Sequence, residues 1–255
     1  MRNYPVIKEK ITEFICRKVQ EAGASGAIIG LSGGIDSALT AYLAVEALGA
    51  DKVLGLLLPE KGITSKQDID DATEVADILR IEPKVIDISK VLSSFSSVIP
   101  DYDKNNFLVN GNLKARTRMC ILYYHANLMR RMVVGTGNKT ELLMGYFTKY
   151  GDGGVDIEPI GGLYKTQVRA LSRHIGVPVH IIDKTPTAGL WPGQTDEGEL
   201  GVTYEVADKI LSMLVDEKKE ISEVKNMFPA PQADRLASLL KANEHKRIPP
   251  DAPEI

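Results

Sequence analysis

A short run rich in glycine and serine is the sharpest chemical feature of the sequence. It reads Gly30-Leu31-Ser32-Gly33-Gly34-Ile35-Asp36-Ser37 and follows an apolar run that is typical of a buried strand. Glycine lets the backbone turn tightly and approach a ligand, and the free N–H groups at a helix start attract anions. No Lys follows the glycines, so the run is not a Walker A motif. It predicts a phosphate-binding loop of another kind, unless it is only a capped strand-to-helix turn.

Two acidic residues stand close to expected strand ends. Asp36 lies at the exit of the glycine-rich run, and Glu141 follows the apolar segment Met132–Val134. Carboxylate oxygens together with nucleotide phosphates are the ligands that Mg²⁺ prefers. A carboxylate in the first turn of a helix is also stabilised by the helix dipole alone, so both interpretations stay open for each residue.

The elements that must position these residues follow from the pattern of apolar residues. Strands and helices alternate over most of the chain, which predicts the α/β class: βαβ units that form a mostly parallel, doubly wound sheet with helices on both faces. The expected strands are Ala27–Leu31, Val53–Leu58, Lys84–Ile88 and Met132–Val134. The expected helices are Val6–Val19, Ser37–Leu48, a segment capped by Ser65 that ends near Leu79, Asn112–Arg131 and Tyr164–Ile175.

The character of the sequence changes after Pro178. The segment Thr185–Gly201 is rich in Gly, Pro and Thr and has no apolar period, which favours a functional loop. Two C-terminal helices are expected near Tyr204–Val215 and Pro231–Asn243, followed by a Pro-rich tail.

Composition limits the classes of protein that need to be considered. The chain has 255 residues, 44% hydrophobic and 25% charged, which is typical of a folded globular protein. A net charge of −3 gives no sign of a nucleic-acid partner, and no apolar stretch is long enough to span a membrane. The lack of a signal peptide and the low cysteine count favour a cytoplasmic protein. Cys16 and Cys120 are expected to be buried as small hydrophobic residues.

The glycine-rich run matches the SGGxDS signature of the N-type ATP pyrophosphatases, in which this loop holds pyrophosphate as the leaving group. Along nearly its whole length the chain resembles the ammonia-dependent NAD synthetases of that superfamily. The resemblance implies an adenine nucleotide alpha hydrolase-like fold with added C-terminal helices. Four further segments carry it: Gly111–Arg118, Gly135–Glu141, Phe147–Asp156, and Pro186–Trp191 with Gln194–Glu197.

The resemblance implies roles for individual residues. Besides the glycine-rich run, the ATP site would contain Thr136, Lys165 and Thr187, and Mg²⁺ would be held by Asp36 and Glu141. Asp36, Lys165 and Asp152 would be catalytic, with Lys165 neutralising charge on the α-phosphate and Asp152 taking a proton from ammonium or orienting ammonia. Arg118 is left open as a structural ion-pair partner. The implied contacts to deamido-NAD are Arg116, Lys149, Asp156, His245 and Lys246.

The resemblance also implies the reaction and the assembly. Deamido-NAD would be amidated with ammonia in an ATP-dependent reaction, through an adenylated nicotinate carboxylate, to give NAD, AMP and pyrophosphate as the last step of NAD biosynthesis. Residues 1–255 would form a single NAD synthetase domain without a glutaminase domain, so the nitrogen source would be ammonia. The family is homodimeric with its active sites at the interface, and it has no nucleic-acid or membrane partner.

Two other functions compete with this one. A tRNA thiolation enzyme or a lysidine synthetase uses the same scaffold, but it needs reactive cysteines or a basic surface. A nucleotide sensor without turnover needs no metal-binding carboxylates, so the presence of Asp36 and Glu141 argues against it.

Overall fold

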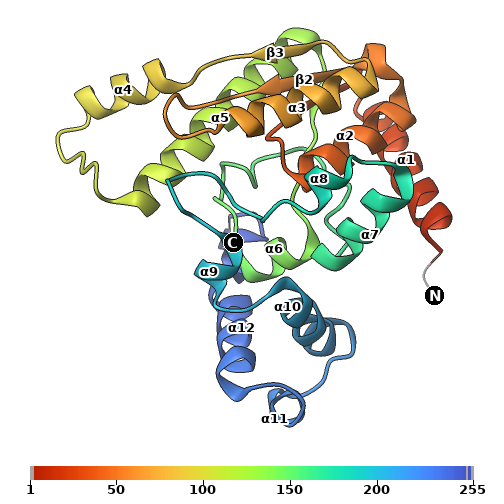
Figure 1. Ribbon diagram of the computed structural model, residues 1–255, viewed down its shortest axis with the longest axis vertical. Coiled ribbons are helices and arrows are strands. Elements are labelled where there is room, and N and C mark those ends of the chain that lie inside the picture. Colours follow the sequence, from red (N-terminus) through yellow and green to blue (C-terminus); the bar gives the residue numbers. More distant parts are fainter. Residues whose placement is uncertain (1–2, 251, 254–255) are drawn as a thin grey trace.

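A four-stranded, all-parallel sheet forms the centre of the computed structural model, which describes residues 3–250 and 252–253 (Figure 1). The strand order is β3-β2-β1-β4. Because the strands are parallel, their carboxyl ends meet at one edge of the sheet, where ligands bind in open α/β folds. The strands are β1 (Ala27–Gly30), β2 (Val53–Leu57), β3 (Pro83–Val85) and β4 (Met132–Val133).

Helices cover both faces of the sheet, as the sequence predicts. Side chains alternate between the faces of a strand, so Ile29 and Ile28 of β1 belong to two different core clusters. The Ile29 cluster packs against α1 (Tyr4–Glu21), α2 (Ile35–Leu48), α3 (Lys66–Leu79), α7 (Lys165–Ile175) and α8 (Val179–Ile182). The Ile28 cluster packs against α4 (Ser89–Val98) and α5 (Phe107–Met129).

The C-terminal helices form a third cluster below the sheet (Figure 1). Their core includes Tyr204, which is completely buried, and Met144 of the helix that follows β4. The expected C-terminal helices are therefore present and pack next to the carboxyl edge of the sheet. The elements are α6 (Lys139–Met144), α9 (Asp196–Leu200), α10 (Tyr204–Leu211) with a π-helical extension Ser212–Asp216, α11 (Ile221–Lys225) and α12 (Ala230–Ala242).

Most expected boundaries are confirmed to within a few residues, and the differences have local causes. Ser65 and Asp68 form the predicted capping box at the start of α3. Helix α5 begins at Phe107 rather than at Asn112, because the side chain of Asn106 accepts the N–H of Val109 and caps an earlier turn. Helices α4, α8, α9 and α11 were not expected, and α9 lies within the segment Thr185–Gly201 that was expected to be a loop.

The expectation of buried cysteines is wrong, because Cys16 and Cys120 are both exposed. The neighbour Ile15 is completely buried, and one residue further along an α-helix the side chain points about 100° away. An apolar neighbourhood in the sequence therefore did not reveal which face of the helix is covered. Within the described residues, every helix is too short or too polar to cross a bilayer.

Candidate active site

The glycine-rich loop joins β1 to α2 at the carboxyl edge of the sheet. Its hydroxyl groups bond to each other: Ser32 Oγ lies 3.0 Å from Ser37 Oγ, and Ser37 Oγ donates to the carbonyl of Gly34 at 3.0 Å. Gly34 is the N-cap of α2, and within the described residues no side chain caps this helix. The first N–H groups of α2 are therefore available to an anion.

Gly33 is required by the shape of this loop. Its φ angle is +77°, a conformation that L side chains rarely adopt, and a Cβ atom here would collide with the carbonyl oxygen of Asp68 in α3. The amino group of Lys184 donates to the Gly33 carbonyl at 3.3 Å and to Asp71 at 2.6 Å. Helix α3 and Lys184 thus support the loop from behind.

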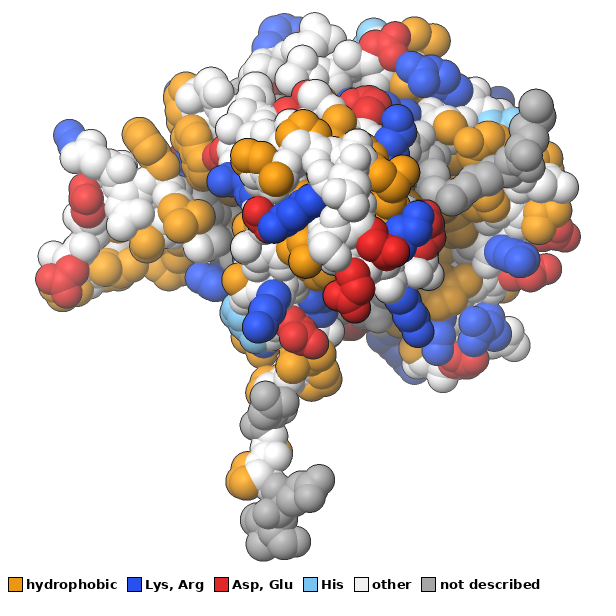
Figure 2. Space-filling model, turned by 90° about the horizontal axis from the view of Figure 1, so that it is seen from below, with side chains coloured by type: hydrophobic (Ala, Val, Ile, Leu, Met, Phe, Trp, Pro, Cys, Tyr) orange, Lys and Arg blue, Asp and Glu red, His pale blue; other side chains and the backbone are white. Residues whose placement is uncertain are grey.

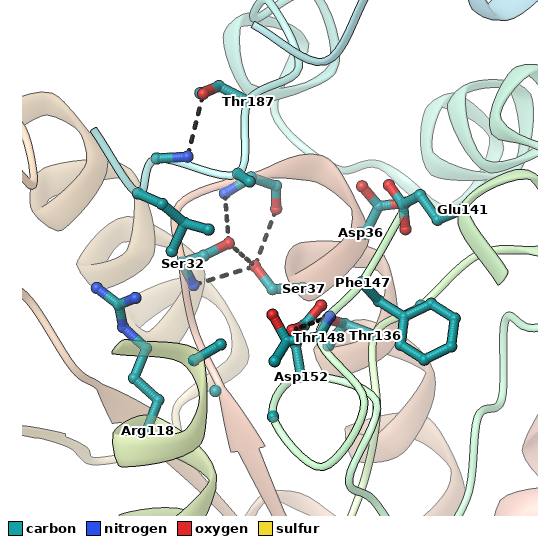
Figure 3. Close-up of a pocket in the computed structure, with 18 of the residues that line it drawn as sticks. Ser32, Asp36, Ser37, Arg118, Thr136, Glu141, Phe147, Thr148, Asp152 and Thr187 are labelled. Atoms are coloured by element: carbon teal, nitrogen blue, oxygen red, sulfur yellow. Dashed lines mark hydrogen bonds between the residues drawn. The ribbon is translucent and has the colours of Figure 1, made fainter. Parts of the chain in front are cut away.

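The loop opens onto a cavity of about 570 Å³, which brings together most of the predicted ATP-site residues (Figure 3). Its wall is made by the carboxyl ends of β1 and β2, one face of α5, the segment after β4 and the loop after α8. Gly33 lies behind the wall. The predicted residues that line the cavity are Gly30, Leu31, Ser32, Gly34, Ile35, Asp36, Ser37, Thr136, Glu141, Asp152, Lys165, Thr187 and Lys246.

Lys165 joins the two predicted metal ligands. Its Nζ lies 2.5 Å from Asp36 Oδ2 and 3.2 Å from Glu141 Oε1, and its side chain is only 2% exposed. Asn138 links the same carboxylates, because its Nδ2 donates to Asp36 Oδ1 at 2.9 Å and its backbone N–H donates to Glu141 Oε2 at 3.2 Å. Residues from three helices thus form one cluster.

The charges in this cluster support each other. Burial alone would lower the pKa of Lys165, but the nearby carboxylates of Asp36 and Glu141 outweigh burial and raise it, so the ammonium group stays charged. Burial raises the pKa of Glu141, and the positive charge of Lys165 opposes that effect. The ring of Tyr204, 5.0 Å from the Lys165 amino group, closes the space around it.

The same cluster fits Mg²⁺ in its donor chemistry. Asp36 and Glu141 offer hard carboxylate oxygens, and both line the cavity next to the loop that attracts phosphate. Lys165 partly balances the two negative charges when no cation is present.

Asp152 lines the cavity on the loop that follows α6, with its side chain exposed to the open volume. Its Oδ1 accepts the N–H of Thr148 at 2.9 Å, and the hydroxyl of Thr148 donates to Asn112 of α5 at 2.7 Å. The side chain of Asp152 faces the open volume of the cavity, while protein surrounds it on the other sides. The protein around this carboxyl group disfavours its charged form and raises the pKa of Asp152, against the opposing effect of the Thr148 N–H.

The segment Thr185–Trp191 forms part of the cavity wall. Thr187 donates its hydroxyl to the carbonyl of Gln194 at 2.8 Å, which holds the segment in a compact turn. Its far end is tied to α5, since Lys114 donates to the carbonyl of Leu190 at 2.8 Å and the ring of Trp191 stacks on that of Phe107. The first part of the Gly- and Pro-rich segment noted in the sequence thus lies against the site, and its last part forms helix α9.

Four of the predicted deamido-NAD residues line no part of this cavity. Arg116 points to the outer face of α5, where its side chain donates to the carbonyl of Lys149 at 3.3 Å. Asp156 accepts the hydroxyl of Tyr123 at 2.9 Å and the N–H of Val133 at 2.7 Å, so it supports the sheet. His245 is exposed, and its carbonyl accepts the Lys149 amino group.

Six charged residues in the cavity wall were not assigned to the site from the sequence: Asp68, Arg118, Glu158, Lys184, Asp196 and Glu199. Arg118 lies in the wall, its Nε donating to the carbonyl of Leu58 at 3.0 Å, and within the described residues no carboxylate lies within 4.0 Å of it (Figure 3). Glu158 lines the cavity beside Thr136. The helical stripe Ala115, Arg118, Met119 and Leu122 could have revealed Arg118, because residues at this spacing share one face. No spacing pattern points to Glu158.

Comparisons with known proteins agree with this geometry. A family model described as NAD synthase matches residues 7–250. An NH(3)-dependent NAD(+) synthetase from Methanosarcina acetivorans is 52% identical over 249 residues, which cover 97% of this chain and 97% of that protein. Two solved structures match over 100% of both chains: an NMN synthetase from Francisella tularensis, with a TM-score of 0.89 and 36% identity, and an NH3-dependent NAD synthetase from Campylobacter jejuni in complex with the nitrate ion, with a TM-score of 0.84 and 31% identity.

Proposed function

Because this chain belongs to the NAD synthase family, we propose that it is a ligase that amidates deamido-NAD with ammonia and cleaves ATP to AMP and pyrophosphate. One observation carries the residue assignments: the glycine-rich loop, the Asp36–Lys165–Glu141 cluster and Asp152 all face the same cavity. Phosphate binding, charge neutralisation and proton transfer are thereby available at one place.

The first step activates the acid. A carboxylate oxygen of the nicotinate group attacks the α-phosphorus of ATP, the bond to the bridging oxygen breaks, and pyrophosphate leaves with the electron pair. The N–H groups and hydroxyls of Ser32–Ser37 hold the β- and γ-phosphates, and Lys165 neutralises charge that develops on the α-phosphate. Mg²⁺ bound by Asp36 and Glu141 would supply further neutralisation of the phosphates.

The second step forms the amide. Ammonia attacks the carbonyl carbon of the adenylate, AMP leaves, and a proton is lost from nitrogen. Asp152 faces the cavity and takes this proton or orients ammonia. The segment Thr185–Trp191 keeps water away from the adenylate, which water would otherwise hydrolyse.

A product assay tests this function. Purified protein supplied with deamido-NAD, ATP, MgCl₂ and ammonium is expected to release NAD, AMP and pyrophosphate in equal amounts, measured by chromatography. Glutamine in place of ammonium is expected to give no NAD. The appearance of ADP, or turnover with glutamine but not with ammonium, would contradict the proposal.

The likeness to an NMN synthetase gives this assay a second arm. Nicotinate mononucleotide, the acid that corresponds to NMN, is offered in place of deamido-NAD. We expect the higher kcat/KM with deamido-NAD, because the relative that is 52% identical is an NAD(+) synthetase. A preference for nicotinate mononucleotide would leave the proposed amidation reaction unchanged but would make the mononucleotide, not deamido-NAD, the substrate.

We also propose a homodimer with the outer face of α5 in its interface. Arg116, Cys120, Tyr124 and Leu128 are spaced by four residues and are all exposed, with Tyr124 at 67% and Leu128 at 68%. Figure 2 shows further hydrophobic side chains on the arm formed by α4 and the start of α5, where Phe107 is 56% exposed. Exposed apolar side chains grouped on one helix face and on the neighbouring arm favour a protein partner. A second subunit here would lie next to Arg116, outside the cavity.

A charge placed in this stripe tests the dimer. Tyr124→Glu is expected to convert the protein from dimer to monomer in sedimentation velocity, because burying an unpaired charge in the interface is costly. Loss of the second subunit next to Arg116 is then expected to raise the KM for deamido-NAD about tenfold. Val179→Glu, at a 66% exposed position of α8, adds the same charge elsewhere and is expected to leave the dimer intact. A monomeric wild-type protein would refute the dimer.

A further inference from the structure

Glu158 lies against the turn of residues 135–139, which joins β4 to the start of α6. Its Oε2 accepts the N–H of Gly137 at 2.9 Å. A Cβ atom on Gly135 would collide with this carboxyl group, and one on Gly137 would lie 3.1 Å from Oε1. The two glycines therefore make room for Glu158, and Glu158 satisfies a donor in the middle of the turn.

The rest of the turn is fixed mainly at its two ends. The N–H of Gly135 donates to the carbonyl of Ile157 at 2.8 Å, and the N–H of Lys139 donates to the carbonyl of Leu163 at 2.8 Å. Between these anchors, Gly137 depends on Glu158 for its hydrogen bond. Loss of that acceptor would leave a part-buried N–H unpaired and free the middle of the turn to move.

This turn carries groups that face the nucleotide. Thr136 lines the cavity, and Asn138 holds Asp36 through its side chain and Glu141 through its backbone N–H. A shift of the turn would displace Thr136 first, because Asn138 is also held by its own contacts to the two carboxylates. Glu158 therefore fixes the position of Thr136 more directly than that of any other residue in the turn.

The charge state of Glu158 suits this place. Burial raises the pKa of Glu158 to about 8, the N–H of Gly137 opposes that effect, and the carboxylates of Glu141 and Asp152 add to it. At pH 7 the group is therefore largely neutral and repels phosphate little. A glutamine at this position would reproduce both the neutral charge and the acceptor oxygen.

We propose that Glu158 is a positioning residue that holds Thr136 in place for contact with ATP, an inference that rests on the ATP site of the proposed function. It acts through the hydrogen bond to Gly137 and touches no reacting atom. Its loss is expected to weaken ATP binding while leaving the ammonia step largely unchanged.

Three variants test this role by calorimetric titration with MgATP and by steady-state kinetics. Glu158→Leu keeps the volume but removes the acceptor, and we expect the Kd and KM for ATP to rise about tenfold with the KM for ammonium unchanged. Glu158→Gln keeps the acceptor, and we expect ATP affinity within about twofold of the wild type. Gly137→Ala crowds the Glu158 carboxyl group and is expected to weaken ATP binding about threefold, which keeps the test valid if the leucine variant does not fold.

The outcomes separate this inference from the proposed function. Wild-type ATP affinity in Glu158→Leu or in Gly137→Ala would overturn the positioning role. So would a Glu158→Gln variant that binds ATP as weakly as Glu158→Leu. Failure of the wild type to form NAD in the same buffer would instead refute the proposed function, because the ATP titrations do not depend on turnover.

Discussion

The Lys165→Met variant is expected to lose about a thousandfold in kcat for NAD formation. The ammonium group lies within 3.2 Å of both predicted metal ligands and stays charged, so it is well placed to neutralise the α-phosphate. Removal of one preorganised group of this kind typically costs two to three orders of magnitude. Methionine keeps most of the volume, and the measurement is the rate of pyrophosphate release at saturating substrates.

Thermal unfolding provides the control for this variant. Loss of Lys165 leaves Asp36 and Glu141 without their buried cation, which typically costs about 3–5 kcal/mol. We expect a lower Tm in chelator and a larger recovery with MgCl₂ in the variant than in the wild type, since a divalent cation replaces the missing charge. Unchanged kcat with a lowered Tm would show that Lys165 only stabilises the fold.

The Asp36→Asn variant is expected to lower pyrophosphate release about a thousandfold at any MgCl₂ concentration. Asparagine has nearly the same size, but it removes the negative charge that would hold Mg²⁺ beside the phosphate loop. Lys165 keeps its contact with Glu141, so the Tm in chelator is expected to fall less than in Lys165→Met. The assay follows pyrophosphate at several MgCl₂ concentrations.

A surface aspartate gives the matched comparison. Asp70→Asn on α3 removes a charge whose partner, Lys66, is 86% exposed, and it is expected to keep wild-type activity. Equal rates for Asp36→Asn and the wild type would remove Asp36 from the metal site. A variant rescued fully by high MgCl₂ would make the carboxylate a determinant of metal affinity alone.

Features coded locally were predictable from the sequence. The glycine-rich loop, β1 and the capping box of Ser65 all rest on residues within about ten positions, where turn chemistry and apolar periodicity act. Helix α4 was missed although Ile88, Leu92, Phe95 and Ile99 recur at helical spacing and Leu92 packs on the core. The helix is short and rich in Ser, which has a modest helix propensity.

Contacts made by tertiary packing were not predictable in the same way. Asp36 and Lys165 were each assigned to the nucleotide site from a resemblance, yet their direct ion pair joins residues 129 positions apart. The role of Glu158 depends on a glycine turn from another segment that packs on its carboxyl group. The exposed Cys120 shows the same limit, since periodicity finds the face of a helix but not its partner.

The central place of β1 governs when the phosphate loop can form. β1 pairs with β2 on one side and with β4 on the other, so it lacks a neighbour until residues 132–133 are available. Pairings so distant along the chain form slowly. The cavity wall also includes Lys165, Thr187 and Lys246, so the nucleotide pocket is complete only when nearly the whole chain is present.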